Sequence, residues 1–76
     1  MIFLKREELT DRQKDTLTFI CLYILKTGYS PSLREIAQGL YISKPVAVRY
    51  IKALESKGYI KHTPNIPRSI VVLKVS

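Results

Sequence analysis

Three helix-start signals stand within a chain of 76 residues, and their spacing limits the folds that this chain can adopt. Thr10 and Ser32 are each followed three residues later by a glutamine or a glutamate. In such a capping box, the hydroxyl and the amide or carboxylate side chain each accept a hydrogen bond from a backbone N–H of the first turn. Ser43 predicts a third start, because the proline at position 45 lies in the first turn, where its missing donor does little harm.

Apolar side chains recur at three- and four-residue spacing after each start, which predicts one buried stripe per helix. Gly28 ends the first helix, and Gly58 follows a third helix that runs to about Lys57. The predicted buried positions are Leu17, Ile20, Cys21, Ile24 and Leu25, then Leu33, Ile36, Ala37 and Leu40, then Ala47, Ile51 and Leu54, with Tyr50 alongside. A turn of about three residues between the second and third helices is the helix-turn-helix spacing.

Past Gly58 the apolar periodicity changes from helical to alternating. The runs 59–63 and 69–75 predict two strands, and the segment 64–67, with its two prolines, predicts the turn between them. A lone hairpin is marginal in water, so Ile60, Ile70 and Val72 should pack on the helices. We therefore expect a mainly α fold with a small β-hairpin, a three-helix winged helix-turn-helix that occupies residues 1–76 as a single domain.

Composition excludes several classes of protein. Cys21 is the only cysteine and His62 the only histidine, so neither a disulfide within the chain nor a four-ligand zinc site is expected. The longest apolar run, 17–25, is far shorter than the roughly 20 residues that cross a bilayer. No nucleophile and base form a recognisable motif, and no glycine-rich phosphate loop occurs. We expect a soluble, cytoplasmic protein that is not an enzyme, needs no cofactor and has no membrane partner.

The charge is concentrated in the second half of the chain. The net charge is +7, and residues 44–76 hold seven Lys and Arg against Glu55 alone, whereas residues 1–43 hold six bases and five acids. This pattern is typical of a domain whose second half faces a polyanion such as DNA. The alternative is a solvated basic face that has no partner.

The third helix carries the predicted DNA-binding face. The major groove admits one α-helix, in which an arginine can grip guanine and apolar side chains can meet the thymine methyl. Arg49 is the predicted base reader, Lys44 and Lys52 are predicted phosphate ligands, and Val46 and Val48 are predicted methyl contacts unless one packs under the hairpin or against the second helix. The DNA-binding residues predicted on this helix are Ser43, Lys44, Pro45, Val46, Val48, Arg49 and Lys52.

Four further residues complete the predicted site. Ser32, at the start of the second helix, has backbone donors that attract phosphate, although its capping role, like that of Ser43, already explains it. Lys61, His62 and Arg68 flank the hairpin turn, where basic side chains can reach the minor groove or its phosphates. For His62 the simpler alternative is a plain exposed strand residue.

Five segments resemble the N-terminal DNA-binding domain of LexA repressors over residues 9–73. The segments are Leu9-Thr-Asp-Arg-Gln, Gly28-Tyr-Ser-Pro-Ser, Arg34-Glu-Ile-Ala, Lys52-Ala-Leu-Glu-Ser-Lys-Gly-Tyr-Ile and Pro67-Arg-Ser-Ile. The resemblance implies a winged helix-turn-helix that binds palindromic operators in double-stranded DNA as a homodimer. Whether the protein is a monomer or a dimer in the absence of DNA is left open. It also implies a repressor of DNA-damage (SOS) genes.

Two departures from that family bear on the function. The segment Ile42-Ser-Lys-Pro-Val-Ala-Val-Arg differs from the small polar pair that many LexA proteins carry there, so no operator sequence is inferred. The family's self-cleaving Ser-Lys peptidase domain does not occur in these 76 residues, so the chain is either a piece of a longer repressor or a stand-alone regulator unrelated to DNA damage. A rival from another class is a protein-binding winged helix that uses Phe19, Leu22 and Tyr23.

Overall fold

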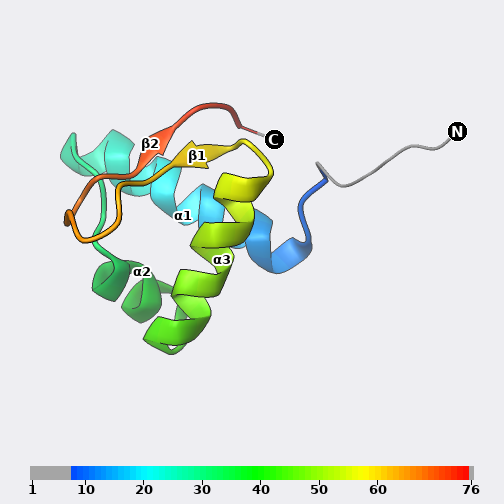
Figure 1. Cartoon of the computed structure of the whole chain (residues 1–76). Coiled ribbons are helices and arrows are strands. Elements are labelled where there is room, and N and C mark those ends of the chain that lie inside the picture. The colour runs from blue at the N-terminus through cyan, green and yellow to red at the C-terminus, as the bar shows by residue number, and fades with distance from the viewer. Residues whose placement is uncertain (1–7, 76) are drawn as a thin grey trace, which may run out of the picture.

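The computed structural model describes residues 8–75 as three helices followed by a two-stranded antiparallel hairpin (Figure 1). The elements are α1 (Asp11–Thr27), α2 (Leu33–Leu40), α3 (Lys44–Ser56), β1 (Ile60–Lys61) and β2 (Val71–Val72). In Figure 1, α3 crosses the front of the molecule, α2 lies beside its N-terminal half, and the hairpin lies above it. This order and pairing confirm the predicted winged helix-turn-helix.

The three helices begin where the capping chemistry predicts. In α1, the backbone N–H of Gln13 donates to Thr10 Oγ1 (3.2 Å) and the N–H of Thr10 donates to Gln13 Oε1 (3.1 Å). In α2, Ser32 and Glu35 make the same reciprocal pair, at 3.1 and 2.9 Å. Ser43 Oγ accepts from the third residue of α3 at 3.4 Å. Each cap contributes about 1 kcal/mol to folding.

The helix ends are set by left-handed residues. Gly28 stops α1 at φ 86°, where its N–H donates to the Ile24 carbonyl (2.7 Å), and Gly58 follows α3 at φ 84°. Tyr41 ends α2 at φ 57° although it is not a glycine. The turn between α2 and α3 is therefore residues 41–43, the three residues that the helix-turn-helix spacing predicts.

The core lies where the three helices and the hairpin meet. In α3, Ala47, Ile51 and Leu54 are fully buried, as predicted. The prediction for Leu25 is wrong, because this side chain is 81% exposed. The buried face of α1 is centred closer to Thr16 than the apolar stripe predicts, and Leu25 lies outside it. The Thr16 hydroxyl can be buried because it donates to a main-chain carbonyl one turn earlier.

Two aromatic side chains on the flank of α1 are used inside the domain. The ring of Phe19 lies so close to Gly39 of α2 that a Cβ at position 39 would be 2.3 Å from Phe19 Cε1. Tyr23 is half-buried, and its ring lies 5.9 Å from that of Tyr29 in an edge-on arrangement. Of the three residues that the protein-binding alternative uses, Leu22 is the one that stays largely exposed, at 59%.

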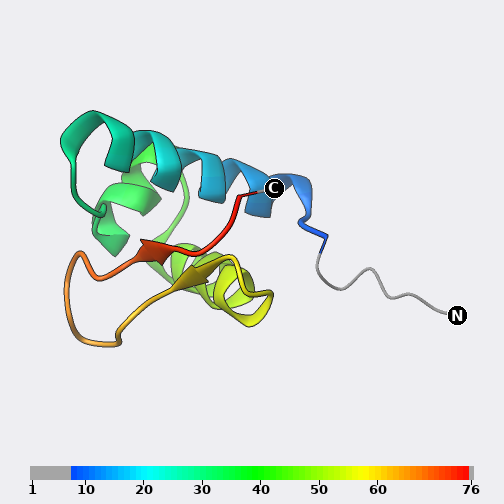
Figure 2. The ribbon, with the colours of Figure 1, turned by 90° about the horizontal axis from the view of Figure 1, so that it is seen from above.

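The hairpin is shorter than the predicted runs, with Ile60 opposite Val72 and Lys61 opposite Val71. Positive φ values at Asn65 (66°) and Arg68 (56°) break the extended backbone between the strands. We call residues 60–72 the wing and residues 63–69 the wing tip. Seen from above in Figure 2, the wing lies beside α3 and its tip projects past the helices. As predicted, Ile60 and Ile70 are buried and Val72 is half-buried.

Candidate nucleic-acid interface

The surface of α3 carries three exposed cations, two on its outward face and one at its first residue. Lys44, Arg49 and Lys52 are all exposed. Arg49 and Lys52 lie on the side of the helix opposite its buried residues, whereas Lys44 is the first residue of the helix, on the same stripe as the buried Ala47 and Ile51. Ser43 and Pro45 are also exposed at the start of the helix. Arg49 and Lys52 share one surface because the helical repeat that buries one face turns the other to solvent.

The two valines of α3 are neither fully exposed nor part of the core. Val46 and Val48 are both half-buried. The partly buried apolar side chains that pack against the core are Phe19, Cys21, Ile24, Leu33, Leu40, Ile42 and Val72, and neither valine is among them. Both valines therefore keep part of their apolar surface exposed to solvent.

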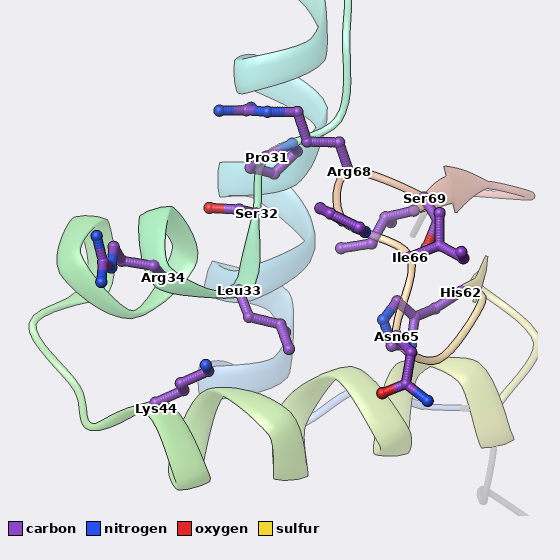
Figure 3. Close-up of a pocket in the computed structure, with 12 residues that line it drawn as sticks. Pro31, Ser32, Leu33, Arg34, Lys44, His62, Asn65, Ile66, Arg68 and Ser69 are labelled. Carbon is purple, nitrogen blue, oxygen red and sulfur yellow. The ribbon is translucent and has the colours of Figure 1, made fainter.

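A groove of about 370 Å³ opens between the start of α2, the start of α3 and the wing (Figure 3). Figure 3 shows Arg34 and Lys44 on one side of this groove and His62 and Asn65 on the other. The backbone N–H groups at the start of α2 add partial positive charge on the same side. The groove therefore joins the cationic start of α3 to the wing, and an anion in it would meet both.

Two of the predicted wing and helix-start residues have roles within the fold. The backbone N–H of His62 donates to Glu55 Oε2 of α3 (3.3 Å), and its side chain is half-buried. Ser32 Oγ accepts the N–H of Glu35, so this hydroxyl is committed to capping α2. Lys61 remains exposed on β1.

The Arg68 guanidinium is directed along the surface toward α1 and the start of α2, and away from the start of α3. Its Nη1 and Nη2 donate to the two carboxylate oxygens of Glu35, both at 2.9 Å. Nη1 also donates to the Ser30 carbonyl at 3.0 Å and to Tyr23 Oη at 3.3 Å. In Figure 3 the side chain runs from the wing back across Pro31, away from the start of α3. We call this set of contacts the Arg68 clamp.

The Arg68 clamp shifts the titration of its own members. The hydrogen bonds from Arg68, and next the one from the Ser32 N–H, lower the pKa of Glu35 from its ordinary value of 4.5 to about 2. The hydrogen bonds from Arg68 to Glu35, and next the one to Tyr23, raise the pKa of Arg68 further above its ordinary value. Both groups therefore stay charged throughout the physiological range.

Acid should weaken the fold through Glu35. Because its pKa is lower in the folded state than in the unfolded state, its contribution to stability is present above about pH 4.5 and is lost as the pH falls toward about 2. The groups that face its carboxylate do not titrate over this range: Arg68 from the wing stays protonated, and Tyr23 from α1 stays neutral because its pKa is raised above 10. Thermal unfolding followed from about pH 6 to about pH 2 should show this loss.

Glu35→Gln is the control for the acid experiment. This variant should show a shallower fall in thermal midpoint over the same range, because every other carboxyl group is present in both proteins. Parallel curves for the two proteins would contradict the assignment of the acid sensitivity to Glu35.

Arg34 and Ile66 line the groove between α2, α3 and the wing, and Tyr41 lies in the turn before α3, but none of them was predicted from the sequence as a site residue. Arg34 is exposed. The net charge of residues 1–43 did not single it out, because five acids nearly balance the six bases of that half. Tyr41, in the turn before α3, is 93% exposed. Ile66 is 54% exposed and follows a Pro-Asn pair with a positive φ at Asn65, a type II turn signature that could have placed Ile66 at the wing tip.

A second groove, of about 540 Å³, lies on another face, between α1 and β2. Three of the apolar side chains that line it are more than half exposed: Leu25, Val71 and Val75. Within residues 8–75, no group of three or more His, Cys, Asp or Glu side chains is placed to hold a metal ion. Over the same residues, no helix has the length and apolar character that a bilayer span requires.

Comparison with known proteins points to one family. A family model described as the LexA DNA-binding domain matches residues 6–69. The LexA repressor of Thermosipho africanus is 47% identical over 68 residues, which cover 90% of this chain and 34% of that repressor. The LexA repressor of Bacillus mycoides is 44% identical over 68 residues, covering 88% of this chain and 33% of its own length. The chain therefore spans about a third of the length of the curated relatives it matches.

Proposed function

The chain belongs to the LexA DNA-binding domain family, and from that membership we propose that it binds double-stranded operator DNA for a LexA-like transcriptional repressor. The observation that carries the proposal is the exposed cationic surface of α3, with Arg49 and Lys52 opposite its buried face and Lys44 at its first residue. An α-helix with this division can enter the major groove while its other side stays packed in the domain.

Each member of the α3 face has a proposed role. Arg49 reads a guanine edge, since its planar fork can make two parallel hydrogen bonds to one base. Lys44 and Lys52 bind phosphates, and the half-exposed valines Val46 and Val48 contact thymine methyl groups. The exposed Ser43 and Pro45 start this helix and bring its first turn close to the DNA backbone.

The wing and the start of α2 are proposed to hold the neighbouring backbone. Lys61 is exposed and contacts a phosphate or the minor groove of the DNA. His62 faces the protein groove between α2, α3 and the wing. Ser32 offers the N-terminus of α2, and the exposed Arg34 adds a cation beside it. The same proposal includes a palindromic operator bound by two copies, control of DNA-damage genes and a cytoplasmic location.

Salt dependence tests the electrostatic part of the proposal. If about five basic side chains neutralise phosphates, the logarithm of the association constant should fall with the logarithm of salt concentration with a slope of about −4 to −5. The measurement is fluorescence anisotropy of a labelled random-sequence duplex over a series of salt concentrations. A slope close to zero would contradict phosphate binding by this surface.

A protein-binding function is the second candidate, and the exposed apolar side chains between α1 and β2 favour it. Apolar association is weakened far less by salt than phosphate binding is. Association that persists at high salt and needs no DNA would support this candidate over the first.

A further inference from the structure

The wing tip is joined to the helices through one polar side chain. Within the part of the chain that the structure describes, the hydrogen bonds from residues 63–69 to the rest of the protein are those of Arg68. The other hydrogen bonds of the tip are internal, such as Thr63 N to Ser69 Oγ (3.0 Å) and Ser69 Oγ to the Thr63 carbonyl (3.0 Å). The residues on either side of the tip are also held, by the His62 N–H to Glu55 Oε2 (3.3 Å) and by the Ile70 N–H to Ser30 Oγ (3.2 Å). The Arg68 clamp is the direct hydrogen-bonded link between the tip itself and the helices.

The backbone at Arg68 shows that its position is imposed. Its φ of 56° is in the left-handed region, which is unfavourable for a residue with a Cβ. Such a conformation persists where surrounding contacts hold it. Here the contacts are the two hydrogen bonds to Glu35 and the position of the guanidinium 4.9 Å from the centre of the Tyr29 ring.

Glu35 connects the clamp to the helix-turn-helix. One of its oxygens, Oε1, accepts both the Ser32 N–H that begins α2 and Arg68 Nη1, each at 2.9 Å. Its other oxygen accepts Arg68 Nη2. Because α2 packs directly on α3, one carboxylate links the wing tip to the two helices of the motif.

We propose that Arg68 and Glu35 are positioning residues for DNA binding: their ion pair holds the wing at a set orientation to α3, so that the wing and the helix reach one operator together. This inference rests on the proposed function and departs from it in one respect, because Arg68 acts through the wing and does not contact DNA. The side chains that touch DNA from the wing are then Lys61 and its neighbours.

Glu35→Gln separates positioning from simple electrostatics by the sign of its effect. A glutamine at position 35 can still cap α2, as Gln13 caps α1. The glutamine side chain has one oxygen in place of two, so its NH₂ group must take the place of one carboxylate oxygen. In either orientation this NH₂ donor faces another donor, an Arg68 N–H or the Ser32 N–H, and at least one hydrogen bond of the clamp is lost. If charge alone mattered, removal of a negative charge would tighten DNA binding. The proposal predicts instead that affinity for the operator falls by about tenfold, comparable to the loss of one DNA contact.

Comparison of the affinities for two DNA probes distinguishes loss of positioning from a general loss of folding. The operator probe is the duplex that wild-type protein enriches from a random pool, and the second probe is a random-sequence duplex. Affinity for the random duplex should be unchanged or slightly higher in Glu35→Gln, because that binding depends on total charge. A variant that is merely less folded would lose affinity for both probes in proportion.

Two further variants complete the experiment. Asp15→Asn makes the same change of charge at an exposed position of α1 and should bind the operator at least as tightly as wild type. Arg68→Lys keeps the charge but loses the paired hydrogen bonds, so it should lose operator affinity as Glu35→Gln does. Operator binding by Glu35→Gln or Arg68→Lys that equals that of wild type would overturn the proposal.

A measurement without DNA keeps this inference separate from the proposed function. Backbone ¹⁵N relaxation should show lower order at the amides of Asn65 and Ser69 in Glu35→Gln than in wild type or Asp15→Asn. Unchanged order at both amides would overturn the inference. Failure of wild-type protein to enrich any duplex would overturn the proposed function instead.

Discussion

Truncation of Ile51 to alanine is expected to destabilise the domain by about 2–5 kcal/mol. Ile51 is 1% exposed and lies in the middle of the α3 face that packs on the other elements. A chain of this length has a total stability of roughly 4–11 kcal/mol, so one such cavity removes a large share of it. Urea unfolding followed by circular dichroism measures the loss, provided that the slope against urea is unchanged.

Lys52→Ala is the matched control for the core variant, because it changes the next residue on the same helix. Lys52 is exposed, so the free energy of unfolding should change by no more than about 0.5 kcal/mol. If Ile51→Ala cost less than about 1 kcal/mol, the assignment of the two faces of α3 would be wrong.

Replacement of Arg49 by alanine is expected to weaken operator binding by about 1–3 kcal/mol and to relax the preference at one base pair. Arg49 is exposed on α3, two turns or less from both Lys44 and Lys52. Loss of its fork removes two hydrogen bonds that only one base edge accepts well. Competition between the selected operator and its single-base-pair variants measures both the affinity and the preference.

Lys52→Ala provides the contrast in the DNA-binding experiment as well. It should weaken binding to all sequences alike and reduce the steepness of the salt dependence by about 1, as expected for a phosphate ligand. If Arg49→Ala retained the wild-type base preference, base reading would have to lie with another residue.

The ends of the helices could be predicted from the sequence because capping is local chemistry. Thr10, Ser32 and Ser43 each satisfy donors within three residues, and Gly28 and Gly58 adopt backbone angles that other residues avoid. These signals depend on neighbours along the chain, so no knowledge of tertiary packing is needed to read them.

Contacts between distant segments could not be predicted in the same way. Arg68 pairs with Glu35 across 33 residues of sequence, and nothing near either residue indicates the other. From the sequence alone, Arg68 resembles a basic wing residue that faces DNA. Its partners on α1 and α2 become visible only when the fold brings these helices and the wing together.

The degree of burial at the edges of helices is also decided by tertiary structure. Helical periodicity places Leu25 on the apolar stripe of α1, yet the neighbouring elements cover a face centred closer to Thr16. The same limit applies to Val46 and Val48, which periodicity assigns to the outer side and the structure leaves half-buried. Both cases lie at boundaries, where a small rotation changes exposure.

Selection of bound duplexes from a random pool tests the central claim most directly, namely that the exposed face of α3 reads DNA sequence. Wild-type protein should enrich a palindromic sequence whose half-sites are separated by about one helical turn or a multiple of it. Arg49→Ala, selected from the same pool, should lose the preference at one position in each half-site. Recovery of unselected, random sequence by the wild-type protein would contradict the claim.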